Sequence, residues 1–595
     1  MVNKAKPAAG VPPAPPAASA FSSARLLYFL LPLAVFVLLS GVLRNGFVNW
    51  DDDFTLQLNP AYRGLSWAHL KWMFTTFHMG HYQPLSWLTF AFDYKVWGLD
   101  PQGYHLTSLL LHCGNAVLFY HAARRLFARL PAGAGATWVC APAAAFSALF
   151  FALHPLRVES VAWATERRDV LSGFFLLLSV CVYLEAAAAG PLLSARALAA
   201  SCACYLLSLL SKGIGVTLPA VLLLLDFYPL RRHASATARQ LLLEKIPYAA
   251  LSLAAGITGL VAAVGTGASS FLNIGDSPTL PERLLQALYA AAFYFWKTLL
   301  PFGLLPLYER PFHIGGQPWY VHAGAAFALA AAAAALLLRR RWPGAAAAWA
   351  AFLLMLVPVA QLVPLGPYLA ADRYTYLACL PFALLAGGLF ARALLAYRPA
   401  FVLAAGAALL LALGLLSGRQ ARHWKDPETL WRRVLAGNPS SSIAHSNLGS
   451  ILLDAQGKTG EAAAHFRQAL ASRPDYPFAN YNYGNALAAQ GRLEEAMEYY
   501  RRTVRLMPGY ANAHFNLGNM LIRSGRPGEA AAAYRETLRL DPGYANAHNN
   551  LAVALLSLGE RETARRHLLE ALRLDPGHAL ARKTLEGLGG GEEVK

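Results

Sequence analysis

The first two thirds of the chain alternate long apolar runs with short polar segments. The runs lie near 26–43, 105–127, 137–153, 168–188, 193–211, 212–229, 246–266, 320–338, 345–364, 373–396 and 398–417. Each run is about long enough to cross the roughly 30 Å hydrocarbon core of a bilayer as a helix. The pattern therefore predicts eleven membrane spans. A further apolar stretch, 284–306, is broken by Lys297, Pro301 and Pro306, and we expect it to re-enter or to lie at the membrane interface.

A different pattern begins near residue 420, where prolines and glycines recur with a spacing of 34 residues. The prolines are Pro474, Pro508, Pro542 and Pro576, and the glycines are Gly457, Gly491, Gly525 and Gly559. This period is the signature of tetratricopeptide repeats, which are helix pairs that must stack to bury their apolar faces. We predict four repeats, preceded by a truncated half-repeat at Trp431–Pro439.

Together these patterns predict an all-α protein, in which a polytopic helical membrane domain of about eleven spans is followed by a tetratricopeptide-repeat α-solenoid. The expected organisation is a disordered basic, proline-rich tail (1–24), the membrane domain (25–418), a connecting half-repeat (419–439), four repeats (440–576), and a C-terminal capping helix and tail (577–595). Repeat arrays of this kind bind peptide segments or serve as passive scaffolds. We take Asn482, Asn516 and Asn550 as candidates for binding an acceptor or a partner.

Composition agrees with a lipid-embedded chain. Hydrophobic residues make up 56% and charged residues 14%, against about 45–50% and about 25% in soluble proteins. The net charge of +18 comes mainly from basic residues in short loops between apolar runs, a pattern typical of cytoplasmic loops rather than of a nucleic-acid interface. The six cysteines all lie in apolar stretches, so we expect neither disulfides nor a metal site there.

The positive charges also set the expected orientation. Basic clusters follow the span at 105–127, the span at 212–229 and the span at 320–338, and they belong on the cytoplasmic side. If 284–306 does not cross, then the loops 44–104, 154–167 and 365–372 and everything after 418 face outward.

The first outward loop carries three adjacent carboxylates, Asp51, Asp52 and Asp53. Their mutual repulsion raises the proton affinity of at least one of them, which suits a general base. Aromatic and apolar neighbours favour a partly buried site over a hydrated acidic turn. His78 and His81 follow in the same loop, but two histidines in a loop are a weak signal for a metal, and we expect none.

Charges of both signs crowd the second outward loop and the span ends near it. His154, Glu159 and Arg168 lie between two spans, while Lys212 and Arg373 lie at the outward ends of others. Ionisable residues near the membrane are costly and point to function, and arginine binds phosphate through parallel hydrogen bonds. Outward cations beside outward carboxylates suit a lipid-linked phosphate with a base next to it. An ion-paired turn and a snorkelling lysine are the structural alternatives.

The chain resembles the transmembrane and tetratricopeptide-repeat protein O-mannosyltransferases and their bacterial relatives, within the wider GT-C class of membrane glycosyltransferases. The resemblance covers nearly the whole chain and rests on the order of its segments together with the repeat tail. The matching segments are Phe47-Val48 to Asp51-Asp52 with Asn59, Tyr82 to Leu85 leading to Leu88-Thr89-Phe90, Tyr104-His105-Leu106 with His112, His154-Pro155 with Glu159, Arg168 with Leu171-Ser172, Ser211-Lys212, and Arg373 with Tyr376-Leu377.

The resemblance implies an inverting transfer of a monosaccharide, with mannose one candidate, from a polyprenyl-phosphate sugar to an acceptor hydroxyl. The hydroxyl could be a Ser or Thr of a protein recruited by the repeats. An acidic residue of the first outward loop is the base in such enzymes, which here makes Asp51 or Asp52 the candidate. The resemblance implies no cofactor besides the donor.

The other candidate roles also follow from the resemblance. Arg168, Lys212 and Arg373 become candidates to hold the lipid phosphate, and His154 and Glu159 become supporting or donor-contacting residues.

Two other functions stay open on the sequence. A membrane-anchored repeat scaffold for envelope or polysaccharide assembly would not need carboxylates at 51 and 52, whereas a transporter would carry charges deep in its spans and internal symmetry. The composition favours a bacterial inner membrane with the repeats in the periplasm.

Overall fold

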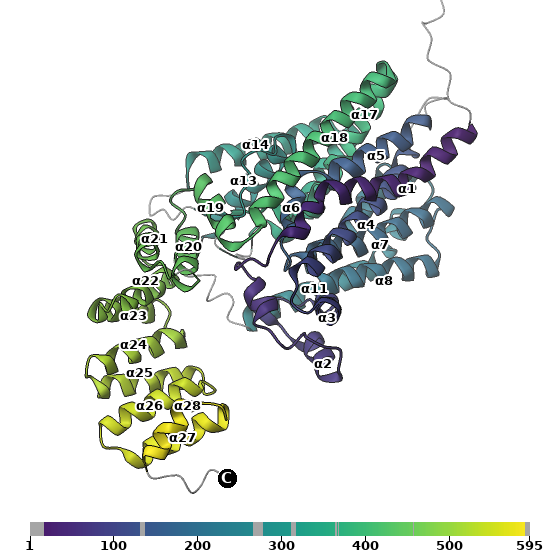
Figure 1. Cartoon of the computed structure of the whole chain (residues 1–595). Coiled ribbons are helices and arrows are strands. Elements are labelled where there is room, and N and C mark those ends of the chain that lie inside the picture. The colour runs from purple at the N-terminus through teal and green to yellow at the C-terminus, as the bar shows by residue number, and fades with distance from the viewer. Residues whose placement is uncertain are drawn as a thin grey trace, which may run out of the picture. The chain divides into compact units, whose positions relative to one another are not determined.

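The computed structural model describes residues 17–130, 137–265, 278–310, 317–362, 366, 368–455 and 457–588. The chain divides into two compact units, Met1–Leu272 with Pro278–Leu430 and Asn273–Ser277 with Trp431–Lys595. Helices make up almost all of the regular structure in the described residues (Figure 1). The predicted all-α class is confirmed.

The first unit consists of helices of very different lengths. They are α1 (Ala17–Leu39), α2 (Trp67–Thr75), α3 (Pro84–Trp97), α4 (Pro101–Phe127), α5 (Cys140–Ala152), α6 (Val158–Ala162), α7 (Arg167–Ala189), α8 (Ala195–Ser211), α9 (Leu218–Phe227), α10 (Ala238–Leu243), α11 (Ile246–Gly265), α13 (Leu280–Leu299), α14 (Trp319–Leu337), α15 (Pro343–Leu356), α16 (Thr375–Ala378), α17 (Leu380–Ala396) and α18 (Pro399–Ala421). The first of them begins inside the segment 1–24 that we expected as a tail.

All eleven apolar runs correspond to helices, but fewer of these satisfy the requirements for a span. Among the described residues, five helices are long and apolar enough to cross a membrane, or up to seven if two bent helix pairs each count as one span. The helices α8, α9 and α15 are apolar but short. The chain is therefore a multi-pass membrane protein, and the expected eleven full spans exceed the number that length and composition support. The 284–306 stretch forms α13, a single helix that ends before Pro301.

The helices α7 and α8 lie side by side (Figure 1). A row of serines connects them. Ser179 and Ser201 exchange hydrogen bonds, and Ser172 and Ser208 lie 3.0 Å apart at their hydroxyls. Small side chains of this kind let membrane helices approach closely. The Ser172 hydroxyl also donates to the carbonyl of Lys212 at 3.1 Å. As a result, the start of α7 and the end of α8 are held side by side.

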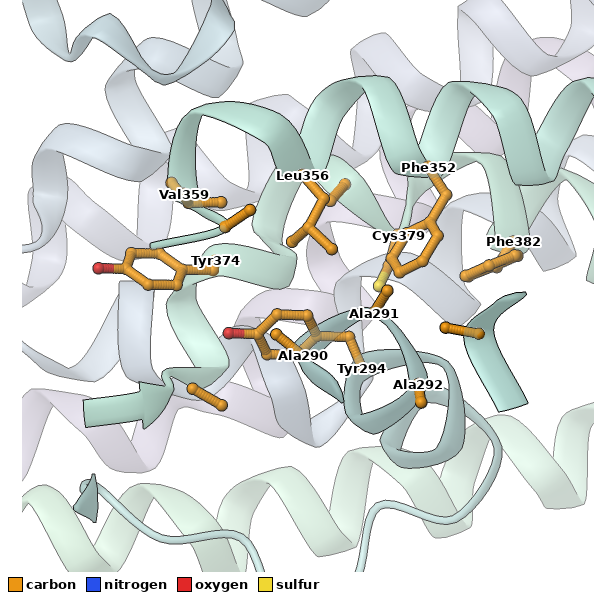
Figure 2. Packing of buried hydrophobic residues seen from close by; sticks show 14 of the residues in the cluster. Ala290, Ala291, Ala292, Tyr294, Phe352, Leu356, Val359, Tyr374, Cys379 and Phe382 are labelled. Carbon is orange, nitrogen blue, oxygen red and sulfur yellow. The ribbon is translucent and has the colours of Figure 1, made fainter. Parts of the chain in front are cut away.

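A hydrophobic core lies where α13 meets α14, α15 and the segment before α17 (Figure 2). Tyr294 of α13 lies among Phe352, Leu356 and Phe382, and its hydroxyl accepts a hydrogen bond from the Ala371 amide at 3.0 Å. Next to it, β1 (Tyr308–Glu309) pairs antiparallel with β2 (Tyr368–Ala370). This packing fixes the backbone immediately before the short helix η9 (Asp372–Tyr374).

The second unit contains the predicted repeats. The helix α19 (Pro427–Gly437) leads into the array, and α28 (Ala579–Gly587) is its last helix. Between them lie four helix pairs: α20 (Ser442–Asp454) with α21 (Thr459–Ser472), α22 (Pro477–Ala489) with α23 (Leu493–Leu506), α24 (Ala511–Arg523) with α25 (Pro527–Leu540), and α26 (Ala545–Ser557) with α27 (Arg561–Leu574). The periodic glycines sit in the turns between paired helices with φ from 62° to 84°, a left-handed conformation that glycine adopts without strain.

Candidate active site

The segment after α1 is tied to distant parts of the first unit. Asn45 donates to the carbonyl of Ala421 at the end of α18, at 3.1 Å, and the amide of Gly46 donates to the carbonyl of Lys425 at 2.8 Å. These bonds hold the start of the acidic loop at a defined place. The three predicted carboxylates follow directly and have three different environments.

Asp52 is fully buried and its carboxylate is saturated with hydrogen bonds. One oxygen accepts from both the amide and the hydroxyl of Thr165, and the other accepts from the amide of Val48 at 3.0 Å. Burial raises the pKa of Asp52 to about 6, against the effect of these bonds, which lower it. Through these bonds Asp52 connects the loop 44–104 to the loop 154–167.

Asp51 is only partly buried, and its carboxylate has no hydrogen-bond partner among the residues that the structure describes. Burial raises the pKa of Asp51 to about 7, while the nearby Arg168 and Arg373 lower it and the nearby Glu166 raises it. A carboxylate that titrates near neutral pH, keeps free lone pairs and faces cations has the properties of a general base. Asp53 differs, because it accepts a hydrogen bond from the adjacent Phe54 amide at 2.9 Å.

Three cations and three carboxylates form a continuous cluster beside Asp51. Arg168 contacts Glu166 at 2.5 Å, Lys212 contacts Glu166 at 2.6 Å and Asp169 at 2.7 Å, and Arg373 contacts Glu159 at 2.5 Å. All six side chains are at most 16% exposed. The structure therefore brings together four of the predicted site residues, Arg168, Lys212, Arg373 and Glu159.

Aromatic rings fix the guanidinium of Arg373. It lies over the rings of Trp163, Tyr368 and Tyr374 at 5.4, 5.1 and 5.0 Å from their centroids. Trp163 in turn lies 5.8 Å from Trp50, the residue next to Asp51. An arginine held by stacking and by a carboxylate is preorganised to receive an anion.

The contacts of the preceding residue, Arg167, fix the backbone next to Arg168. Arg167 is completely buried, contacts Asp93 of α3 at 2.5 Å and donates to the carbonyl of Tyr104 at 2.7 Å. Its guanidinium also lies 4.7 Å from the centroid of Phe90. This buried ion pair fixes the first turn of α7 and leaves Arg168 on the side of Glu166.

His154, a predicted site residue, contacts a different part of the structure from the other site residues. His154 contacts the carbonyl of Thr298 in α13 through Nε2 at 3.1 Å, and its Nδ1 accepts from the amide of Leu156. Its contacts thus hold the second loop against α13. His81, which was considered only as a metal ligand, lies near the cluster, where the positive charges of Arg168 and Lys212 lower its pKa.

No group of three His, Cys, Asp or Glu side chains in the described residues has the arrangement of a metal site. A cavity of about 490 Å³ is lined by residues of α8 and α11, including Cys202, Leu206 and Leu251. No acidic or basic side chain lines this cavity, so we place the candidate chemistry at the charged cluster.

Sequence reasoning did not select Glu166 and Asp169 as site residues, nor the Asp93–Arg167 pair. Glu166 contacts three cations from three separate segments, a property that depends on tertiary packing. The available signal was the dense mixture of charges between 154 and 169, which marks the region but not the partners.

The repeat asparagines link each repeat to the one before it. Asn482 donates to Ser450 at 2.8 Å, Asn516 to Asn485 at 3.0 Å, and Asn550 to Asn519 at 2.8 Å. Each donor lies on the first helix of its pair, as does each acceptor. The three candidate residues therefore belong to a ladder of amides along the first helices of the array.

These features define a polytopic helical membrane unit with a buried charge cluster, followed by a repeat array. Residues 416–477, 452–511 and 515–579 match a family model described as Tetratricopeptide repeat, which confirms the predicted repeats. Part of this chain is similar to the crystal structure of MamA, with 23% identity over 26% of this chain and 88% of MamA at a TM-score of 0.24.

The resemblance to the transmembrane and tetratricopeptide-repeat proteins is confirmed by curated relatives. The chain is similar to protein O-mannosyl-transferase Tmtc3 of Drosophila melanogaster, with 25% identity over 68% of this chain and 50% of the relative. It is also similar to human protein O-mannosyl-transferase TMTC1, with 25% identity over 74% of this chain and 54% of the relative. The chain thus spans about half the length of these relatives.

Proposed function

We propose that the chain is a membrane glycosyltransferase that moves a monosaccharide from a polyprenyl-phosphate sugar to an acceptor hydroxyl. The observation that carries the proposal is the Asp51 carboxylate, which has no described hydrogen-bond partner and lies in the field of Arg168 and Arg373. The names of the relatives support mannose as the sugar and a protein as the acceptor.

In the proposed reaction, Asp51 takes the proton of the acceptor hydroxyl. The hydroxyl oxygen then attacks the anomeric carbon from the face opposite the phosphate, so that the new glycosidic bond has inverted configuration. The carbon–oxygen bond to the phosphate breaks, and the phosphate leaves with the bonding electron pair. Arg168 and Arg373, with Lys212, are the cations that stabilise this developing charge, and Glu159 orients Arg373.

The repeats would recruit the acceptor. Asn482, Asn516 and Asn550 each donate a hydrogen bond to the preceding repeat. We propose that the side-chain amides along this row also form hydrogen bonds with an extended segment of the acceptor protein. We place the charged cluster and the repeats on the outward, periplasmic side of a bacterial inner membrane. The lipid-linked sugar is the only co-substrate that this reaction requires.

The test is consumption of labelled polyprenyl-phosphate mannose by the purified full chain in detergent with a Ser/Thr-containing acceptor peptide. Asp51→Asn is compared with the matched control Asp53→Asn, whose carboxylate only accepts from its neighbouring amide. We expect Asp51→Asn to lose about 100-fold or more in rate, the scale of a general base, and the control to stay within a few fold. Equal rates for wild type and Asp51→Asn would refute the base, and no transfer with any lipid-linked hexose would favour a scaffold.

A further inference from the structure

The cluster contains one carboxylate with an unusual position. Glu166 has no exposed surface and contacts three cations that come from the first turn of α7, from the end of α8 and from η9. Its Oε1 accepts from Nη2 and Nε of Arg168 at 2.5 and 3.2 Å and lies 3.7 Å from Nε of Arg373. Its Oε2 accepts from Nζ of Lys212 at 2.6 Å.

The partners of the three cations are not equivalent. Arg373 has a second carboxylate in Glu159, and Lys212 has a second one in Asp169. For Arg168, Glu166 is the one ion-pair partner found among the described residues. Among the described residues, the Nε and Nη2 atoms of Arg168 therefore donate to Glu166 alone.

Charge balance shows why this occupancy matters. Three carboxylates already neutralise three cations in the cluster. An incoming phosphate gains little attraction from a neutral cluster unless it takes over a cation from a carboxylate. Carboxylate and phosphate oxygens accept the same paired hydrogen bonds from arginine, so the Oε1 side of Glu166 occupies the place that a phosphate oxygen would need.

We propose that Glu166 is a resident anion that the lipid phosphate displaces on binding and that competes the phosphate product out after transfer. The proposal rests on the proposed function, because it assumes a lipid phosphate at this cluster. Arg168 and Arg373 would exchange Oε1 of Glu166 for phosphate oxygens. Oε2 would keep Lys212, so that displacement does not leave a buried carboxylate unpaired, which would be costly.

The two roles open to Glu166 predict opposite signs for one substitution. If Glu166 only positions the cations, then Glu166→Gln loosens them and weakens phosphate binding. If it competes for them, then Glu166→Gln keeps the shape, removes the competing charge and strengthens binding. We expect the Kd for the product to fall at least about tenfold, the low end of what a hydrogen bond between charged groups contributes.

The experiment measures binding of a short-chain polyprenyl phosphate to the purified full chain in detergent. Wild type, Glu166→Gln and Arg168→Gln are compared with Glu185→Gln, a control that removes a partly exposed carboxylate near the far end of α7. We expect tighter binding by Glu166→Gln, weaker binding by Arg168→Gln and an unchanged Kd for the control. If Glu166→Gln does not fold, Glu166→Asp, whose shorter side chain withdraws from Arg168, should also bind more tightly than wild type.

Each other outcome has one meaning. In one outcome, wild type binds polyprenyl phosphate, Arg168→Gln loses binding, and the Glu166 variants bind equally or more weakly than wild type. This result would refute the competition by Glu166 but would leave the proposed function standing. Absence of polyprenyl phosphate binding in every variant, wild type included, overturns the proposed function itself.

Discussion

Replacing Arg168 with glutamine should shift the pH dependence of sugar transfer as well as its rate. After burial, Arg168 is the largest influence on the pKa of Asp51, which it lowers, and Glu166 raises that pKa. Arg168→Gln removes the attraction and also leaves Oε1 of Glu166 less neutralised. Both changes favour the protonated form of Asp51, so its pKa must rise.

The magnitude follows from the proximity of one opposite charge, which lowers the pKa of a carboxyl by about 1 to 3 pH units. In Arg168→Gln, the pKa at which Asp51 becomes ionised should therefore lie between about 8 and 10 rather than near 7. Each unit of this pKa shift corresponds to about 1.4 kcal/mol of lost stabilisation of the ionised carboxylate. Activity rises with pH through this midpoint, because only the ionised carboxylate accepts the proton.

The assay is the pH profile of kcat at saturating lipid-linked sugar. Arg168→Lys is the control, because it keeps the charge but not the planar fork, and we expect a lower rate with a midpoint still near that of wild type. A slower Arg168→Gln enzyme with an unshifted midpoint would refute the assignment of Asp51 as the base.

Two further substitutions test the packing that supports the site and the repeats. Asp93→Asn leaves Arg167 buried without its ion-pair partner. The loss should lower the free energy of unfolding by about 3 to 5 kcal/mol and appear as a lower melting temperature in detergent. An unchanged melting temperature would contradict the structural role of this pair. Gly518→Ala places a Cβ 2.6 Å from the ring of Tyr534. This contact should lower the free energy of unfolding of residues 431–595 in urea by about 1 to 3 kcal/mol. The control Gly528→Ala meets open space and should not destabilise that unit.

The periodic parts of this protein were predictable from sequence because their signals are local. The 34-residue spacing gives the helix pairs directly, since each glycine occupies a left-handed turn that repeats with the unit. Apolar runs likewise gave the positions of the long helices. The number of full spans was less predictable, because a run such as 212–229 begins with the short 3-10 turn Gly213–Gly215 and forms only a short helix, α9.

The candidate site was predictable as a set of charges but not as a set of pairs. The cations Arg168, Lys212 and Arg373 were selected because isolated charges near a membrane are costly. Sequence alone did not distinguish Asp51 from Asp52, because the difference lies in Thr165, more than a hundred residues away, which binds one of them. Glu166 was missed for the same reason, since its three partners meet only in the fold.

The role of Asp51 as the base is tested by single-turnover transfer with Asp51→Asn and Asp52→Asn, measured together with their melting temperatures. We expect Asp51→Asn to melt like wild type but to transfer sugar about 100-fold or more slowly. Asp52→Asn should melt at a lower temperature, because an amide NH₂ cannot accept the hydrogen bond from the Val48 amide. Rapid transfer by a well-folded Asp51→Asn protein would show that Asp51 is not the base.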